Sequence, residues 1–152
     1  MKAIALDVGD KTIGVALSDA LMLTAQGLMT IERIGIKKDT DKVLALVQEH
    51  QCDTIIIGLP LNLDGSDSVQ TEKVRLFREK LENKMRSNAI KNIRVEFQDE
   101  RFTTKIAEAV LIDADVSRKK RKEVIDKQAA IIILQSWMDR QAFIKKQEEE
   151  MD

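Results

Sequence analysis

The sequence has few of the residues that mark secreted, membrane-bound or low-complexity chains. A single cysteine, Cys52, excludes an internal disulfide bond and is consistent with a reducing compartment. One proline and six glycines in 152 residues exclude a linker-rich protein. The longest uninterrupted apolar run, residues 129–134, is far shorter than the ~20 residues of a membrane span, and the N-terminus does not follow the signal-peptide pattern. We therefore expect a cytoplasmic protein with no membrane partner.

Aromatic side chains are scarce and the net charge is small. Only 3% of the residues are aromatic and none is tyrosine, which argues against a stacking platform built from several rings. The formal net charge is −1, from 25 basic and 26 acidic residues, so bulk condensation of nucleic acid is not indicated. The length and the 43% apolar content fit one domain, expected over residues 1–145, with an acidic tail at residues 146–152.

Apolar periodicity predicts five strands and four helices. The strands are expected at residues 2–8, 13–18, 27–34, 54–58 and 93–98. The last helix should start near residue 120, and the others at one of each pair of N-cap candidates: Asp39 or Thr40, Ser66 or Ser68, and Thr103 or Thr104. Three strands close in sequence favour an antiparallel meander, whereas strands separated by helices favour parallel pairing. The pattern therefore predicts an α/β fold with a mixed five-stranded sheet flanked by helices.

Polar residues follow three of these predicted strands at one edge of the sheet. Asp7 ends the first strand, a loop beginning at Gly58 follows the fourth, and Asp99 and Glu100 end the fifth. Sites in such sheets form beyond the carboxyl ends of parallel strands. An Asx-type turn would explain Asp7 or Asp99 taken alone. Polar residues at the ends of several strands instead favour a functional site. Strand alternation leaves Asp99 and Glu100 as alternatives, since it places them on opposite faces.

The last predicted helix adds a third carboxylate. Asp126, Ala130, Ile133 and Trp137 are spaced by 4, 3 and 4 residues, so they share one face of the helix. The small and apolar members indicate that this face packs against the sheet. A carboxylate there is unfavourable unless it is paired or binds a cation. The alternative to a metal ligand is a salt bridge with Lys127 or Arg101.

Three carboxylates gathered at one edge would repel one another strongly without a cation. Oxygen-only ligands suit Mg²⁺ or Mn²⁺. A cluster that holds two such ions about 4 Å apart can stabilise both the attacking and the leaving oxygens of a phosphodiester. The residues therefore predict a two-metal nuclease site with water as the nucleophile. Its metal ligands, which are also its catalytic residues, are expected to be Asp7, Asp126 and either Glu100 or Asp99.

Basic residues near the same edge are candidates for binding phosphate. Lys11 and Arg101 follow predicted strands, and Arg118, Lys119 and Arg121 belong to the densest basic run, residues 118–122. Cations in the first turn of a helix oppose its dipole, and an anionic partner would relieve that conflict. A solvated helix start is the alternative interpretation of the run.

Four blocks of this sequence resemble the YqgF (RuvX) family. They read DVGDKTIGVALSD at residues 7–19, GLPLNLDGS at residues 58–66, DERFTT at residues 99–104 and DKQAA at residues 126–130. The blocks stand in the family's order and span nearly the whole chain. The resemblance implies a ribonuclease H-like fold and a nuclease.

The resemblance also implies particular site residues. Its acidic set is Asp7, Glu100 and Asp126, which selects Glu100 over Asp99 by analogy, and we include Asn62 of the second block among the expected substrate-binding residues. One position departs from the pattern, because the family often has arginine where this chain has Thr12. If that arginine binds a phosphate, either Lys11 takes its place or this contact is lost.

Family members are described both as pre-16S rRNA nucleases and as Holliday-junction resolvase homologues. We expect processing of the 5′ end of pre-16S rRNA, with branched DNA as the alternative substrate and a catalytically silent nucleic-acid-binding module as a further alternative. The residues themselves favour neither RNA nor DNA. An Asp-x-Gly strand end also opens the sugar-kinase and actin-like ATPases, but those enzymes bind nucleotide between two such domains and this chain supplies one.

Overall fold

The computed structural model describes the backbone of residues 2–101 and 118–151, and the side chains of residues 2–101 and 127–151. The predicted helix after Thr103 or Thr104 lies outside the described residues. The strands are β1 (Ala3–Val8), β2 (Thr12–Ser18), β3 (Ala25–Glu32), β4 (Thr54–Leu59) and β5 (Arg94–Asp99). The described helices are α1 (Ile36–Glu49), α2 (Val69–Ser87) and α4 (Arg118–Met151). No described helix is long and apolar enough to cross a membrane.

The five strands form one sheet in the order β3-β2-β1-β4-β5. β1, β2 and β3 pair in antiparallel fashion, whereas β1 with β4 and β4 with β5 are parallel. The predicted meander followed by parallel crossovers is therefore confirmed. Because β1, β4 and β5 run in the same direction, their carboxyl ends meet at one edge of the sheet.

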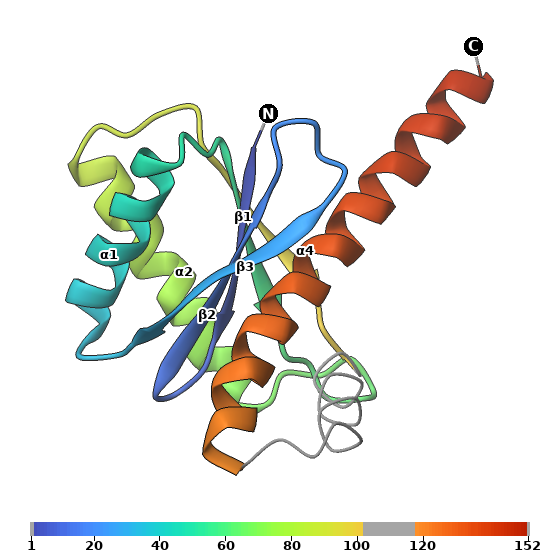
Figure 1. Ribbon diagram of the computed structural model, residues 1–152. Helices are drawn as coiled ribbons and strands as arrows, with labels where there is room; N and C mark the ends of the chain where they lie inside the picture. The colour runs from blue at the N-terminus through green and yellow to red at the C-terminus, as the bar shows by residue number, and fades with distance from the viewer. Residues whose placement is uncertain (1, 102–117, 152) are drawn as a thin grey trace.

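Helices cover both faces of the sheet, with α1 and α2 on one side and α4 on the other (Figure 1). Residues of β1 alternate between these two layers: Ile4 and Leu6 pack in the core under α1 and α2, and Ala3 and Ala5 pack in the core under α4. Small residues on the α4 side let that helix approach the sheet closely. Asp7, two residues beyond Ala5, therefore lies on the α4 face.

The helical face predicted to pack on the sheet does so. Ala130, Ile133 and Trp137 are 0%, 0% and 2% exposed, in the core shared by α4 and the sheet. α4 includes Arg118, two residues before its predicted start, and it continues to Met151, so most of the acidic tail is helical. Figure 1 shows the C-terminal part of α4 projecting beyond the sheet. The domain boundary after residue 145 stays a prediction.

The predicted N-cap of α2 is confirmed at Ser68. Its hydroxyl accepts a hydrogen bond from the Thr71 backbone N–H at 3.1 Å, and the Thr71 hydroxyl accepts one from the Ser68 N–H at 2.9 Å. This reciprocal pair satisfies two of the donors that a helix start leaves unpaired. Ser66, the other candidate, instead donates its hydroxyl to Asp64 in the preceding loop.

The predicted N-cap of α1 is wrong. Gly35 caps this helix without a side-chain hydrogen bond, while Asp39 and Thr40 lie within its first two turns. The Asp39 carboxylate turns back to accept hydrogen bonds from the Ile34 N–H at 3.0 Å and from Arg33 Nε at 2.9 Å. The helix can thus begin earlier, because Arg33 and the Ile34 N–H engage the side chain that the capping rule assigns to a helix start.

Candidate active site

Asp7 lies at the carboxyl end of β1, half-buried on the α4 face of the sheet. It stands directly opposite Gly14 of β2 in the antiparallel ladder. Gly14 has no side chain, so no β2 side chain lies beside the Asp7 carboxylate at this position of the ladder. The other neighbour of β1 is β4, whose carboxyl end leads to Gly58 and Leu59.

Three elements fix the backbone immediately after Asp7. The Gly9 N–H donates to the Thr12 carbonyl at 2.9 Å and closes the turn between β1 and β2. Arg33 Nη1, at the end of β3, donates to the Gly9 carbonyl at 2.8 Å. Gln70 Nε2, at the start of α2, donates to the Val8 carbonyl at 3.0 Å. The backbone after Asp7 is therefore held by one local turn and by two side chains, Arg33 and Gln70, that are far away along the chain.

Glu100 follows β5 and is 8% exposed. Its backbone N–H donates to the Leu59 carbonyl at 3.2 Å, which holds it beside the end of β4. A Cβ added to Gly58 would stand 2.7 Å from Glu100 Oε2, so the carboxyl group lies directly over that glycine. Burial, and after it the negative charges of Asp7 and Asp99, raise the pKa of Glu100 to about 8. The structure therefore brings Glu100 close enough to Asp7 for the two charges to interact.

Asp99 is engaged in a different interaction. Its carboxylate accepts a hydrogen bond from Arg101 Nε at 2.8 Å and one from the Arg101 backbone N–H at 3.0 Å. The hydrogen bond from the Arg101 side chain is the main cause that keeps the pKa of Asp99 below its usual range. Arg101 Nη1 also donates to the Leu63 carbonyl at 3.2 Å. The geometry thus groups Glu100 with Asp7, and it places Asp99 in an ion pair that anchors the loop after β4.

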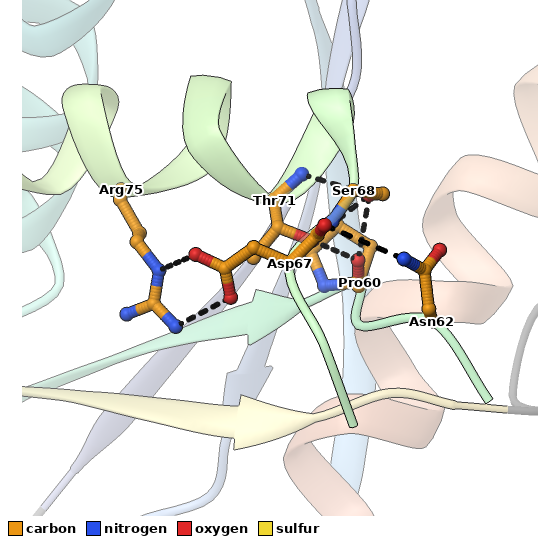
Figure 2. Close-up of polar contacts among 6 residues, drawn as sticks. All are labelled: Pro60, Asn62, Asp67, Ser68, Thr71 and Arg75. Atoms are coloured by element: carbon orange, nitrogen blue, oxygen red, sulfur yellow. Dashed lines mark hydrogen bonds and ion pairs between the residues drawn. The ribbon is translucent and has the colours of Figure 1, made fainter. Parts of the chain in front are cut away.

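That loop, residues 60–68, closes on itself through Asn62, whose hydrogen bond to Asp67 is drawn in Figure 2. Asn62 Nδ2 donates to Ser66 Oγ at 3.0 Å and to the Asp67 carbonyl at 3.3 Å. Asp67 in turn accepts two hydrogen bonds from Arg75 of α2, at 2.9 and 3.0 Å. Asn62, an expected substrate-binding residue, is thus an exposed bridge that shapes the loop beside Glu100.

The remaining predicted site residues are only partly described. Asp126 lies in α4 two turns before Ile133, the residue whose Cδ1 stands against Gly58, and the side chain of Asp126 is outside the described residues. The same holds for the side chains of Arg118, Lys119 and Arg121. Within residues 2–101 and 127–151, no group of three or more His, Cys, Asp or Glu side chains could hold a metal ion. Lys11 is exposed in the turn after β1.

Comparison with known proteins places the chain in a family. The family model described as "RuvX: Holliday junction resolvase" matches residues 1–140. The chain belongs to the RuvX family. A relative from Clostridioides difficile (strain 630) is 52% identical over 134 residues, which cover 88% of this chain and 91% of that protein. A relative from Natranaerobius thermophilus is 45% identical over 141 residues, 93% of this chain and 96% of that protein. Both relatives carry the name "Putative pre-16S rRNA nuclease".

Solved structures of similar shape come from Holliday-junction resolvases. RuvC of T. thermophilus in complex with a Holliday junction substrate aligns with a TM-score of 0.57 and 11% identity, covering 93% of this chain and 96% of that one. The Fowlpox virus resolvase with its Holliday junction DNA aligns with a TM-score of 0.52 and 14% identity, covering 92% and 98%. At these identities the likeness bears on the fold alone, and it confirms the expected ribonuclease H-like fold.

Two positioning residues of this RuvX chain are not indicated by the sequence patterns. Arg33 and Gln70 hold the loop after Asp7, yet neither belongs to a block of the family resemblance or to a strand end that faces the site. Arg33 is itself fixed by Asp39, which is 1% exposed. Burial raises the pKa of Asp39, but the hydrogen bonds from Arg33 and Ile34 outweigh it and hold that pKa below its usual range. Such interactions depend on the folded topology, so no local pattern could indicate them.

Proposed function

We propose that this chain is a divalent-metal-dependent nuclease that hydrolyses phosphodiester bonds during processing of the 5′ end of pre-16S rRNA. The observation that carries the proposal is the buried Glu100 carboxyl, which lies over Gly58 at the edge where three parallel strands end, close enough to Asp7 for the two charges to interact. Membership of the RuvX family supports nuclease chemistry. The name of the two relatives supports precursor ribosomal RNA as the substrate.

The donor set at this edge fits a divalent cation. Asp7 and Glu100 supply only carboxylate oxygens, the ligands that Mg²⁺ and Mn²⁺ prefer. Burial and mutual repulsion raise the pKa of Glu100, and a cation between the two groups would offset that repulsion. We propose Asp7, Glu100 and Asp126 as the residues that would hold one or two such ions. When bound, the ions would supply positive charge against the oxygens of the reacting phosphate.

The surrounding residues would bind and orient the nucleic acid. Lys11, exposed in the turn that follows Asp7, would bind a phosphate near the scissile bond. Arg101 would act indirectly, by holding the loop that carries Asn62 in place. Its side chain donates hydrogen bonds to Asp99 and to the Leu63 carbonyl. Arg118, Lys119 and Arg121 would bind further phosphates along the start of α4.

The proposal is tested by cleavage of two substrates side by side. The first is an RNA fragment that spans the 5′ end of precursor 16S rRNA, and the second is a four-way DNA junction. We expect the full chain to cleave the RNA in Mg²⁺ or Mn²⁺ and to lose that activity in EDTA. Cleavage of the junction with none of the RNA would replace the proposed substrate by branched DNA, which the family description favours. Cleavage of neither would overturn the nuclease proposal.

A further inference from the structure

A pocket of about 330 Å³ opens beside the proposed active site. The described residues that line it are Thr12, Thr30, Glu32 and Lys127, contributed by β2, β3 and α4. It therefore combines two hydroxyls, a carboxylate and an ammonium group. This set is unlike the apolar lining of a pocket for a drug-like molecule, and every member can hydrogen-bond to a polar ligand.

The ladder of the sheet links this pocket to Asp7. Asp7 stands opposite Gly14, and Gly14 stands opposite Thr30. Residues directly opposite in neighbouring strands share one face, so Thr30 lies on the α4 face two strand spacings, about 10 Å, from Asp7. Gly14 offers no side chain to separate the two. The pocket is therefore near enough to Asp7 for one nucleic-acid strand to reach both.

Close packing of α4 on β3 places Lys127 at this point. A Cβ added to Gly27 would lie 3.7 Å from Lys127 Cβ and 3.7 Å from its Cδ, so the stem of the lysine rests on bare backbone. Lys127 also follows Asp126 directly in the sequence. A long amphipathic side chain held by its stem presents its ammonium group in a defined place.

We infer that this pocket binds the ribose and phosphate of a nucleotide adjacent to the scissile bond, and that it makes the chain prefer RNA. The inference rests on the proposed function. The Lys127 ammonium suits a phosphate oxygen. A site for phosphate alone would not include the Glu32 carboxylate, which repels an anion. Glu32 and Thr30 instead suit a 2′-hydroxyl, which can donate to a carboxylate and which DNA lacks.

Binding measurements on the full chain test this inference. An Asp7→Asn background prevents turnover, and the probes are a labelled single-stranded RNA from the precursor 5′ region and its 2′-deoxy counterpart of the same sequence. Lys127→Gln should weaken the binding of both probes about tenfold. It should also lower the slope of log affinity against log salt concentration by about one. Lys127→Arg should restore the affinity, because it keeps the charge. Lys145→Gln, on the projecting part of α4, is the matched control and should bind like the parent.

Recognition of the ribose has its own measurement. Thr30→Val should weaken binding of the RNA probe and leave binding of the deoxy probe unchanged. Glu32→Gln removes a charge that repels phosphate, so it should strengthen binding of the deoxy probe more than that of the RNA probe. In both variants the ratio of RNA affinity to DNA affinity should fall. If Lys127→Gln and Lys145→Gln bind the probes with equal affinity, the assigned phosphate binding is overturned. If the ratio of RNA affinity to DNA affinity is unchanged in both Glu32→Gln and Thr30→Val, the assigned ribose binding is overturned. Failure of the proposed function has a different signature, because the parent chain would then leave the RNA fragment uncleaved while these binding differences persisted.

Discussion

Glu100 is a carboxyl group whose pKa is raised first by burial and then by the negative charges of Asp7 and Asp99. Its pKa of about 8 lies well above the ordinary 4.5. Between these values the folded chain keeps a proton that the unfolded chain has lost. The free energy of unfolding of the metal-free protein should therefore fall as the pH rises from about 5 to about 8. Urea denaturation in EDTA checks this, and an equal pH dependence in Glu100→Gln would contradict the assignment.

Gly58 provides the space that Glu100 occupies. An added Cβ would overlap Ile133 Cδ1 and stand 2.7 Å from Glu100 Oε2. Gly58→Ala should therefore cost about 1–3 kcal/mol of stability through overpacking. Because the methyl group also displaces the carboxylate, RNA cleavage should fall further than the unfolded fraction explains. Chemical denaturation and single-turnover cleavage of the same preparation measure both effects. Full activity in the folded Gly58→Ala protein would show that Glu100 need not lie over residue 58.

Sequence patterns predict these residues as candidates but cannot group them. β1 is buried on both faces, so its apolar run has no alternation and does not reveal which way Asp7 points. Strand alternation does not choose between Asp99 and Glu100. In the structure Gly58 pairs with Gln98, and the Glu100 carboxyl lies over Gly58. The sequence indicates Gly58 only as the start of a loop, because its role depends on Ile133 of a helix far along the chain.

At the level of elements, the end of β3 and the start of α1 brace the turn that follows Asp7. Arg33 links Asp39, which is 1% exposed, to the Gly9 carbonyl. Arg33→Met would strand the buried Asp39 carboxylate, and we expect a loss of about 3 kcal/mol in the free energy of unfolding. Differential scanning calorimetry or urea denaturation measures the loss. RNA cleavage should fall as well, since the Gly9 turn loses its brace.

Arg75→Met is the matched control for that change. Arg75 also forms an ion pair and lies over a phenylalanine, 5.6 Å from the ring centroid compared with 5.5 Å for Arg33. Its partner Asp67 is 39% exposed, so the expected cost is within about 1 kcal/mol. Equal losses in the two variants would contradict the idea that the buried carboxylate dominates.

The helix starts show where local rules succeed and fail. Ser68 caps α2 as predicted because its partner Thr71 lies three residues away, within the reach of a sequence pattern. Asp39 does not cap α1, because Arg33 and the Ile34 N–H compete for its carboxylate. The face of α4 that carries Ala130 is predictable, since burial repeats with the helical period.

Over the whole molecule, strand order and direction follow from the spacing of strands and helices along the chain. Short links between β1, β2 and β3 permit only hairpins, and the helix-containing links before β4 and β5 require crossovers. The pocket at Thr30 and Lys127 is not predictable from the sequence, because it depends on how α4 crosses β2 and β3. In the proposed function, one bound strand would contact the carboxylates, that pocket and the start of α4.

The basic run at the start of α4 should control affinity across the molecule. Neutralising Arg118, Lys119 and Arg121 together should weaken RNA binding and reduce the log–log salt slope by about one for each phosphate that is no longer neutralised. Neutralising Lys145 and Lys146, at the other end of α4, should leave the slope unchanged. Fluorescence anisotropy over a series of salt concentrations compares the two. Identical salt slopes in both variants would support the alternative interpretation, in which the basic run is a solvated helix start that does not bind phosphate.

The most direct test of the account is the rate at which Asp7→Asn cleaves the precursor 16S RNA fragment in Mg²⁺ or Mn²⁺. Loss of a group that merely supports a metal ligand typically costs about 10–100-fold, so loss of a ligand should cost at least about a hundredfold. Asp10→Asn is the control, because Asp10 lies close by in the same turn and is 62% exposed in an ion pair with Lys73. The account predicts a folded, inactive Asp7→Asn and an active Asp10→Asn. Cleavage by Asp7→Asn at the parental rate would contradict it.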